Sequence, residues 1–191
     1  VIDGIINNHR LKKENYYKIF GDQNQIEKFL DSKIDNQIID SPVILNKEQE
    51  NAKLEIFKSI NNSYKPVVLE GVTGSGKTEV YFEIIDHIIK NNSQILIMVP
   101  EISLTPQLEK RFKKRFGIDI FIWHSKISKT NRQKIWHHCY KGDKIIVIRA
   151  RASLFLPFAN LGLIVVDEEH DSSYKQEENI RYHARDLAIA R

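Results

Sequence analysis

The sequence of 191 residues has little cysteine, no long apolar run and no strong excess of one charge, and each shortage excludes a class of protein. The only cysteine, Cys139, excludes an internal disulfide and a zinc site built from several cysteines. A reducing, cytoplasmic setting is the default for such a chain. The longest apolar runs, such as LGLIVV, are too short to span a bilayer, so we expect no membrane partner. The formal net charge of +4 permits a polyanionic partner without requiring one.

The order of polar and apolar segments divides the chain into two parts. Residues 1–40 are polar with scattered apolar positions, and we interpret them as the remnant of a small, partly helical upstream domain, for which a winged helix is one candidate. Residues 41–191 alternate between strand and helix patterns, with continuous Ile and Val runs. Such runs are typical of strands covered on both faces, so this part is predicted to be an α/β, three-layer domain with a mostly parallel sheet. The expected strands are 66–71, 94–100, 118–123, 144–148 and 161–167, and the expected helices are 47–60, 77–90, 106–116 and 129–141.

The stretch GVTGSGKT, at residues 71–78, stands between an expected strand and an expected helix and fits the pattern G-x-x-x-x-G-K-[ST]. Glycines there let successive backbone N–H groups surround a phosphate, and the following helix directs its positive end at the anion. Lys77 supplies a charge for the β- and γ-phosphates, and the Thr78 hydroxyl can bind Mg²⁺. The plainer alternative is a flexible glycine turn that caps a helix. The predicted nucleotide-binding residues are Gly71, Val72, Thr73, Gly74, Ser75, Gly76, Lys77 and Thr78.

A second acidic element follows the apolar strand LIVV in the sequence DEEHD. Asp167 comes where that strand emerges, which suits coordination of Mg²⁺ directly or through water. Glu168 is the natural candidate to position and deprotonate an attacking water. The alternative is an acidic cluster that simply solvates a strand end, which the upstream GVTGSGKT stretch disfavours.

The segments GVTGSGKTEVY, VPEISLTPQ, LFLPFANLGLIVVDEEHDSSYKQEE and RYHARDLAIAR together resemble the replication restart DNA helicases of superfamily 2, the primosomal protein N′ (PriA) family. The resemblance covers roughly residues 45–191 and implies a truncated first lobe of a RecA-like, P-loop motor. It implies ATP and Mg²⁺ as cofactors, 3′ to 5′ movement on single-stranded or forked DNA, primosome and replisome partners, and a bacterial cytoplasmic setting. The zinc module of the family lies in segments that this sequence does not contain.

The resemblance also assigns roles to residues outside the two nucleotide motifs. His170 would couple the ATP site to DNA-bound elements, and its alternative is a capping or core histidine. Gln49 would contact adenine, and its alternative is a capping box with Asn46. The DNA-side residues implied by the family pattern are Pro100, Thr105, His124, Arg151 and Lys175. The basic run in helix 106–116 could also contact DNA, but such a run is more often a solvated helix face.

One segment departs from the family pattern. The chain reads IVIRARASLF where the family reads IVIGTRSALF, so Arg149 replaces a glycine and Ala150 a threonine, whereas Arg151 keeps the arginine. Either Arg149 holds a DNA phosphate there, or the loop has lost that function. An arginine finger from a second lobe raises the rate by three to five orders of magnitude. We therefore expect this chain alone to bind ATP weakly, hydrolyse it poorly and unwind nothing. The alternatives are a nucleotide-dependent binding module without turnover and a different P-loop NTPase.

Overall fold

The computed structural model describes residues 43–62, 65–72, 74–100, 106–118, 120–123, 127–149, 151–178 and 180–191. The helices are α4 (Lys47–Asn62), α5 (Lys77–Lys90), α6 (Pro106–Phe116), α7 (Lys129–Lys141) and α8 (Ala184–Ala190), with the short 3-10 helices η2 (Arg151–Phe155) and η3 (Ser172–Tyr174). The strands are β1 (Gln94–Met98), β2 (Ile120–Ile122), β3 (Ile146–Ile148), β4 (Leu161–Val166), β5 (Lys175–Gln176) and β6 (Tyr182–His183). The upstream domain predicted for residues 1–40 lies outside the described residues.

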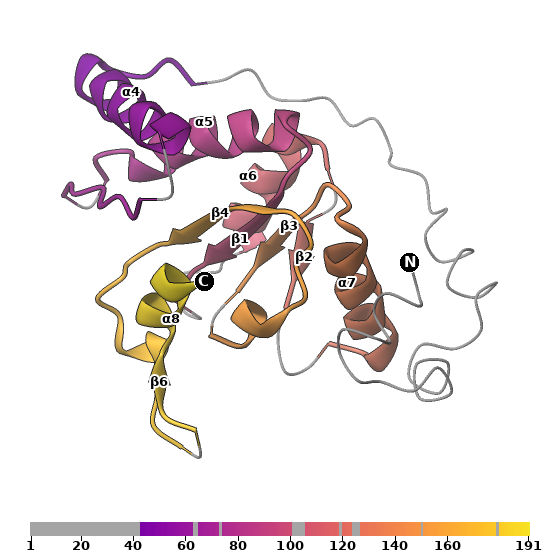
Figure 1. Cartoon of the computed structure of the whole chain (residues 1–191). Coiled ribbons are helices and arrows are strands. Elements are labelled where there is room, and N and C mark those ends of the chain that lie inside the picture. The colour runs from indigo at the N-terminus through magenta and orange to yellow at the C-terminus, as the bar shows by residue number, and fades with distance from the viewer. Residues whose placement is uncertain are drawn as a thin grey trace.

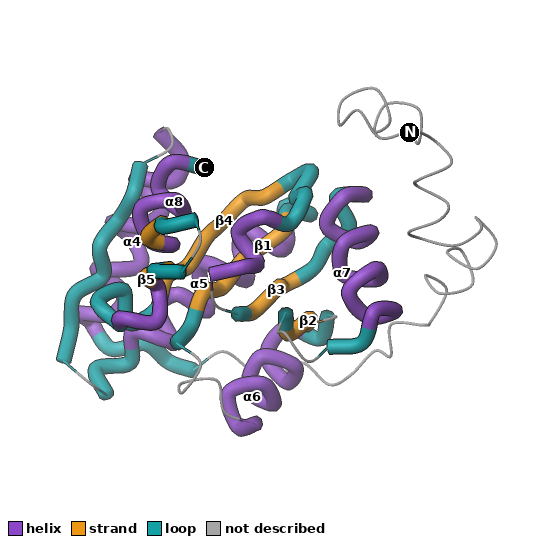
Figure 2. Tube along the Cα trace, turned by 90° about the horizontal axis from the view of Figure 1, so that it is seen from below, coloured by secondary structure: helices purple, strands orange, loops and turns teal. Residues whose placement is uncertain are grey.

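Four parallel strands form the sheet in the order β2-β3-β1-β4, as Figure 1 shows. In β1, Leu96 is aligned with Val147 of β3 on one side and with Ile164 of β4 on the other. Parallel neighbours require a crossover connection, and helices α6 and α7 make those crossovers on either side of β2 (Figure 2). The predicted parallel α/β sheet is therefore confirmed.

Helices cover both faces of the sheet, because successive side chains of a strand point to opposite faces. Ile95 and Ile97 of β1 join a cluster with helices α5 and α6, against which α4 also packs. Leu96 and Met98 of the same strand face the opposite way and pack with α7, η2 and α8. This arrangement explains why the strands read as continuous apolar runs, and it confirms the three layers.

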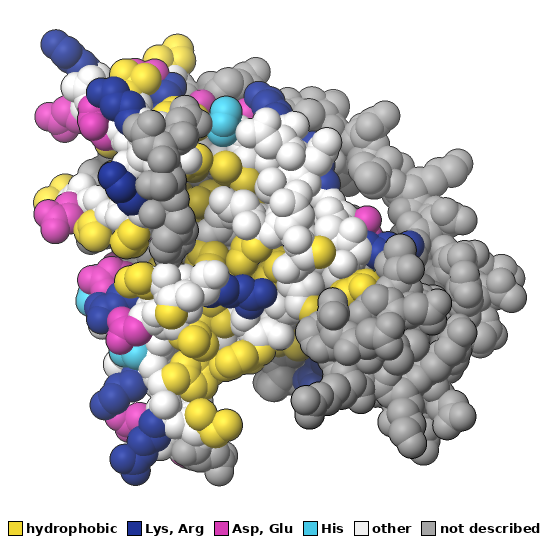
Figure 3. All heavy atoms as spheres, viewed as in Figure 1, with side chains coloured by type: hydrophobic (Ala, Val, Ile, Leu, Met, Phe, Trp, Pro, Cys, Tyr) yellow, Lys and Arg dark blue, Asp and Glu magenta, His cyan; other side chains and the backbone are white. Residues whose placement is uncertain are grey.

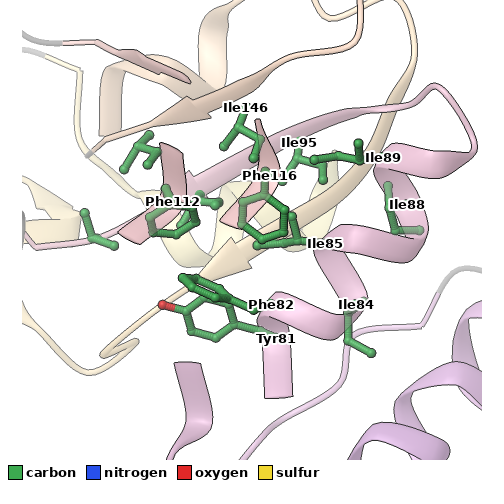
Figure 4. Close-up of a cluster of buried hydrophobic side chains, with 13 residues drawn as sticks. Tyr81, Phe82, Ile84, Ile85, Ile88, Ile89, Ile95, Phe112, Phe116 and Ile146 are labelled. Atoms are coloured by element: carbon green, nitrogen blue, oxygen red, sulfur yellow. The ribbon is translucent and has the colours of Figure 1, made fainter. Parts of the chain in front are cut away.

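Aromatic and isoleucine side chains of α5 and α6 fill the first of these clusters (Figure 4). The rings of Phe82 and Phe112 meet edge to face with centroids 4.7 Å apart, and Phe116 lies 5.2 Å from Phe82. Ion pairs join the same two helices at the surface, because Arg111 pairs with Glu79 and Arg115 with Glu83. Two arginines of the basic run in α6 thus bind α5, whereas the run was interpreted as a solvated or DNA-facing surface.

The strand predicted for residues 66–71 is wrong. Residues 65–72 contain no strand, and Val67 and Val68 remain 46% and 77% exposed. Strand preference reflects packing in a sheet as much as the backbone itself, and this segment makes no ladder with β4, the edge strand of the described sheet. The Val-rich run alone therefore could not establish that a strand forms there.

One buried polar side chain ties three elements together at the amino end of the sheet. Gln94, the first residue of β1, is fully buried. Its amide nitrogen donates to the carbonyls of His138, Cys139 and Asp143 at the end of α7, and its oxygen accepts from the Asn160 amide just before β4. A buried amide with all its partners satisfied fixes the relative positions of these segments.

Replacing Gln94 with Ala should lower the free energy of unfolding by about 2–4 kcal/mol, because buried carbonyls lose their donor and a cavity remains. Urea unfolding followed by circular dichroism measures this loss. The matched control is Gln133→Ala on α7, where the side chain is only half-buried and the expected change is within about 0.5 kcal/mol. Equal effects of the two substitutions would contradict the role given to Gln94.

Candidate nucleotide site

Glycines impose the shape of the loop that leads into α5. Gly74 and Gly76 both have φ of 81°, in the left-handed region that favours glycine. A Cβ on Gly76 would lie 2.2 Å from Gln49 Nε2, and one on Gly71 would lie 2.6 Å from Ser75 Oγ. Gly76 is also the cap of α5 and has no side chain that could bond the first amides of the helix. The start of α5 is therefore open to an anion.

Lys77, the first residue of α5, lies across this loop. Its Nζ donates to the carbonyl of Gly71 at 2.7 Å and to that of Val72 at 3.3 Å. The glycine loop at residues 71–76 thus binds the Lys77 ammonium group, and its glycines leave the backbone amides without side-chain cover. A cation and backbone amides that converge in this way are typical of phosphate sites.

Gln49 connects the beginning of α4 to the glycine loop. Its oxygen accepts from the Asn46 amide at 2.9 Å, and its own backbone amide donates to Asn46 Oδ1 at 2.9 Å, which is a capping box. Its amide nitrogen donates to the Ser75 carbonyl at 2.8 Å. The capping-box alternative is therefore present in the structure, and both ends of the side-chain amide are engaged with the protein. Contact with adenine stays a prediction that requires these bonds to rearrange.

A single hydrogen bond joins the end of β4 to α5. Tyr81 Oη donates to Asp167 Oδ2 at 3.3 Å. Tyr81 lies one turn after Thr78, so this bond ties the part of α5 that carries Thr78 to the strand end that carries Asp167. Hydroxyl and carboxylate oxygens are ligands that Mg²⁺ binds, directly or through water.

The electrostatic environment of Asp167 suits a cation. Burial raises the pKa of this carboxyl above its usual value, and the nearby charge of Glu168 raises the pKa further, while Lys77 acts in the opposite direction. A divalent cation beside the carboxyl would favour its ionised form and so reverse the effect of burial. The residues present therefore fit a bound Mg²⁺.

The two candidate residues after Asp167 lie in an exposed turn. Glu168 has φ of 49°, a left-handed conformation that is uncommon for a residue with a Cβ. The His170 side chain is 76% exposed and its Nε2 lies 3.6 Å from Glu168 Oε2, so the interpretation of His170 as a core histidine is wrong. A strained backbone at a candidate catalytic carboxylate agrees with a functional constraint on that turn.

A second tyrosine holds the backbone of the same strand end. Tyr174, in η3, is fully buried, and its hydroxyl is bonded to the carbonyls of Asp167 at 2.6 Å and Met98 at 2.9 Å. The carboxyl ends of β1 and β4 are thereby fixed side by side. The sequence did not predict the hydrogen bonds of either tyrosine hydroxyl.

The predicted DNA-side residues have different environments. The Arg151 guanidinium donates to the Lys175 carbonyl. These two residues line a hollow together with Ser172, Gln176, Glu177 and Glu178. Positive and negative side chains mix along this edge of the molecule, in the lower left of Figure 3, and Lys175 Nζ itself pairs with Glu177 at 2.6 Å. Pro100 is buried beyond the end of β1. The remaining predicted contacts, Thr105 and His124, lie outside the described residues, as do Thr73 of the glycine loop and Ala150.

The segment that contains the glycine loop, Lys77 and Asp167 matches a known family. The family model described as "Type III restriction enzyme, res subunit" matches residues 42–189. The chain belongs to this family. The match begins before α4 and ends in α8, so the res-subunit domain includes both nucleotide motifs and the β5–β6 hairpin.

Curated relatives of this res-subunit domain carry the name replication restart protein PriA. The chain is 49% identical to the one from Haemophilus influenzae over 145 residues (76% of this chain, 20% of the relative), and 53% identical to the one from Rickettsia typhi over 148 residues (77% and 22%). The one from Bacillus subtilis is 40% identical over 182 residues, which is 95% of this chain and 22% of that protein. The chain therefore spans about a fifth of the length of these relatives and is homologous to their helicase region, which confirms the family resemblance.

Among the described residues, no helix has the length and apolar character needed to cross a bilayer.

Replacing Gly76 with Ala should weaken nucleotide binding at least tenfold, because the new Cβ would displace Gln49 and strain a backbone with φ of 81°. Fluorescence titration with an N-methylanthraniloyl ATP analogue measures this. Gly142→Ala is the matched control, since Gly142 has φ of 78° at the end of α7 but its Cβ would meet no atom closer than 3.7 Å. Similar affinities for the two variants would show that the Gly76 contact does not shape the site.

Proposed function

We propose that this chain is the first RecA-like lobe of an ATP-dependent 3′ to 5′ DNA helicase that acts in replication restart. The observation that carries the proposal is the hydrogen bond from Tyr81 to Asp167, which joins the end of β4 to the helix whose start the glycine loop exposes. Membership of the res-subunit family and the name of the curated relatives support the motor assignment.

In this proposal, residues of the glycine loop, of α5 and at the end of β4 bind different parts of the nucleotide and its cation. The amides of the loop and the Lys77 ammonium bind the β- and γ-phosphates. Thr78 and Asp167 would hold Mg²⁺, which supplies charge neutralisation on the phosphates when it is bound with ATP. Gln49 fixes the loop through the Ser75 carbonyl.

Glu168 would orient the attacking water and accept its proton. The carboxylate follows Asp167 directly, and the left-handed backbone at Glu168 turns the chain away from the line of β4. His170 Nε2 lies 3.6 Å from Glu168 Oε2. In this proposal, His170 would couple the ATP site to the DNA-bound elements.

The DNA contacts of the proposal lie at the carboxyl edge of the sheet. Arg151 and Lys175 border one hollow, and Tyr174 connects that hairpin to the Asp167 backbone. Thr105, His124 and Pro100 are assigned to the same side by the family pattern alone. Single-stranded or forked DNA is the proposed substrate, with primosome proteins as partners.

A second candidate is a nucleotide-dependent binding module without turnover. It is favoured by the exposed segment 65–72, which makes no strand ahead of the glycine loop. ATP hydrolysis with and without single-stranded DNA separates the two candidates. Slow hydrolysis that rises above background when DNA is added supports the motor, and ATP binding with no hydrolysis above background supports the module.

Lys77→Ala should lower ATP affinity at least tenfold, because the positive charge proposed to bind the phosphates is lost. Glu168→Gln should leave ATP affinity within about twofold, but it should lower the rate of hydrolysis at least a hundredfold. Binding is measured by fluorescence titration and hydrolysis by phosphate release. Lys90→Ala is the control, since Lys90 lies at the other end of α5 and pairs with Asp86. Normal turnover in Glu168→Gln would contradict its assignment as the base.

Lys175→Ala should weaken binding to single-stranded DNA and reduce the slope of log affinity against log salt by about 0.7, the value for one phosphate contact on a single strand. Fluorescence anisotropy at several salt concentrations measures the slope. Lys58→Ala on α4, where Lys58 pairs with Glu55, should leave it unchanged. An unaltered slope for Lys175→Ala would place the DNA elsewhere.

A further inference from the structure

Tyr81 combines a buried ring with a hydroxyl that points away from the core. The residue lies on α5 one turn after Thr78, on the apolar stripe that continues with Ile84 and Ile88, and it is 7% exposed. In Figure 4 its ring lies beside Phe82, while its oxygen points away from the labelled isoleucines. A phenylalanine would fill the same volume, so packing does not explain the hydroxyl.

The hydrogen bond of this hydroxyl has a defined direction. A tyrosine hydroxyl has one proton, and Tyr81 Oη donates it to Asp167 Oδ2 at 3.3 Å. The bond restrains this oxygen of Asp167, and the other lone pairs of the carboxylate remain for another partner.

We propose that Tyr81 is a positioning residue that orients the Asp167 carboxylate to receive the divalent cation of a nucleoside triphosphate complex. The inference rests on the proposed function and adds to it a residue that acts through Asp167.

A purely structural role for Tyr81 makes a different prediction from a positioning role. If the hydroxyl only satisfies a half-buried carboxylate, its loss weakens the fold and lowers nucleotide affinity equally with and without the cation. If it orients the carboxylate toward the cation, the loss appears only when the cation is present.

The experiment compares Tyr81→Phe with the unmodified chain of 191 residues, using the N-methylanthraniloyl ATP analogue in EDTA and in increasing Mg²⁺. We expect affinity in EDTA to stay within about twofold, affinity in saturating Mg²⁺ to fall about three- to tenfold, and the Mg²⁺ concentration for half-maximal binding to rise. Tyr140→Phe on α7, whose ring stacks on Trp136, is the matched control and should behave as the unmodified chain.

A double-mutant cycle tests the same link from its other end. In an Asp167→Asn background, Tyr81→Phe should change the Mg²⁺ dependence by less than about twofold, because the acceptor that it orients has been altered. Equal losses with and without Mg²⁺, an unchanged Mg²⁺ dependence, or additive losses in the cycle would each overturn the inference while leaving the proposed function intact. Absence of any Mg²⁺-dependent binding by the unmodified chain would overturn both.

Discussion

The uncovered amide groups at the start of α5 are the constraint on which the rest of the site depends. They can bind an anion only if no side chain occupies the turn, so the loop must use glycine, and Gly76 must hold a backbone that other residues avoid. A loop of that kind has little rigidity of its own. It is held by contacts from outside, from Gln49 of α4 on the Ser75 carbonyl and from Lys77 on the carbonyls of Gly71 and Val72.

A half-buried carboxylate beside this loop requires support of the same kind. Asp167 is restrained at its side chain by Tyr81 of α5 and at its carbonyl by Tyr174 of η3. The two tyrosines come from segments that lie 86 and 7 residues away from Asp167, so the site is assembled from both halves of the domain. Gln94 performs a related task at the opposite end of β1, which leaves that strand fixed at both ends.

Much of the fold could be predicted from the sequence, because its strongest signals are local. The continuous Ile and Val runs of β1 and β3 report burial on both faces, and the period of Val80, Ile84 and Ile88 reports one helix face. The run at residues 66–71 has the same local signal, but whether it joins a sheet depends on a neighbour far along the chain. The links of Tyr81 were missed for the same reason, since the residue fits an apolar stripe and only the folded chain brings its hydroxyl to Asp167. The left-handed turn at Glu168 has no sequence signal of its own, because glutamate rarely adopts it.

The ion pairs between α5 and α6 have a mechanical consequence. Glu79 lies in the first turn of α5 and Glu83 in the next, and both are tied to arginines of α6, with Phe82 packed against Phe112 and Phe116 beneath them. Such a double attachment resists sliding and rotation of one helix against the other. A ligand that displaced α6 by a small distance would therefore also move the first turn of α5, where the proposed phosphate site lies.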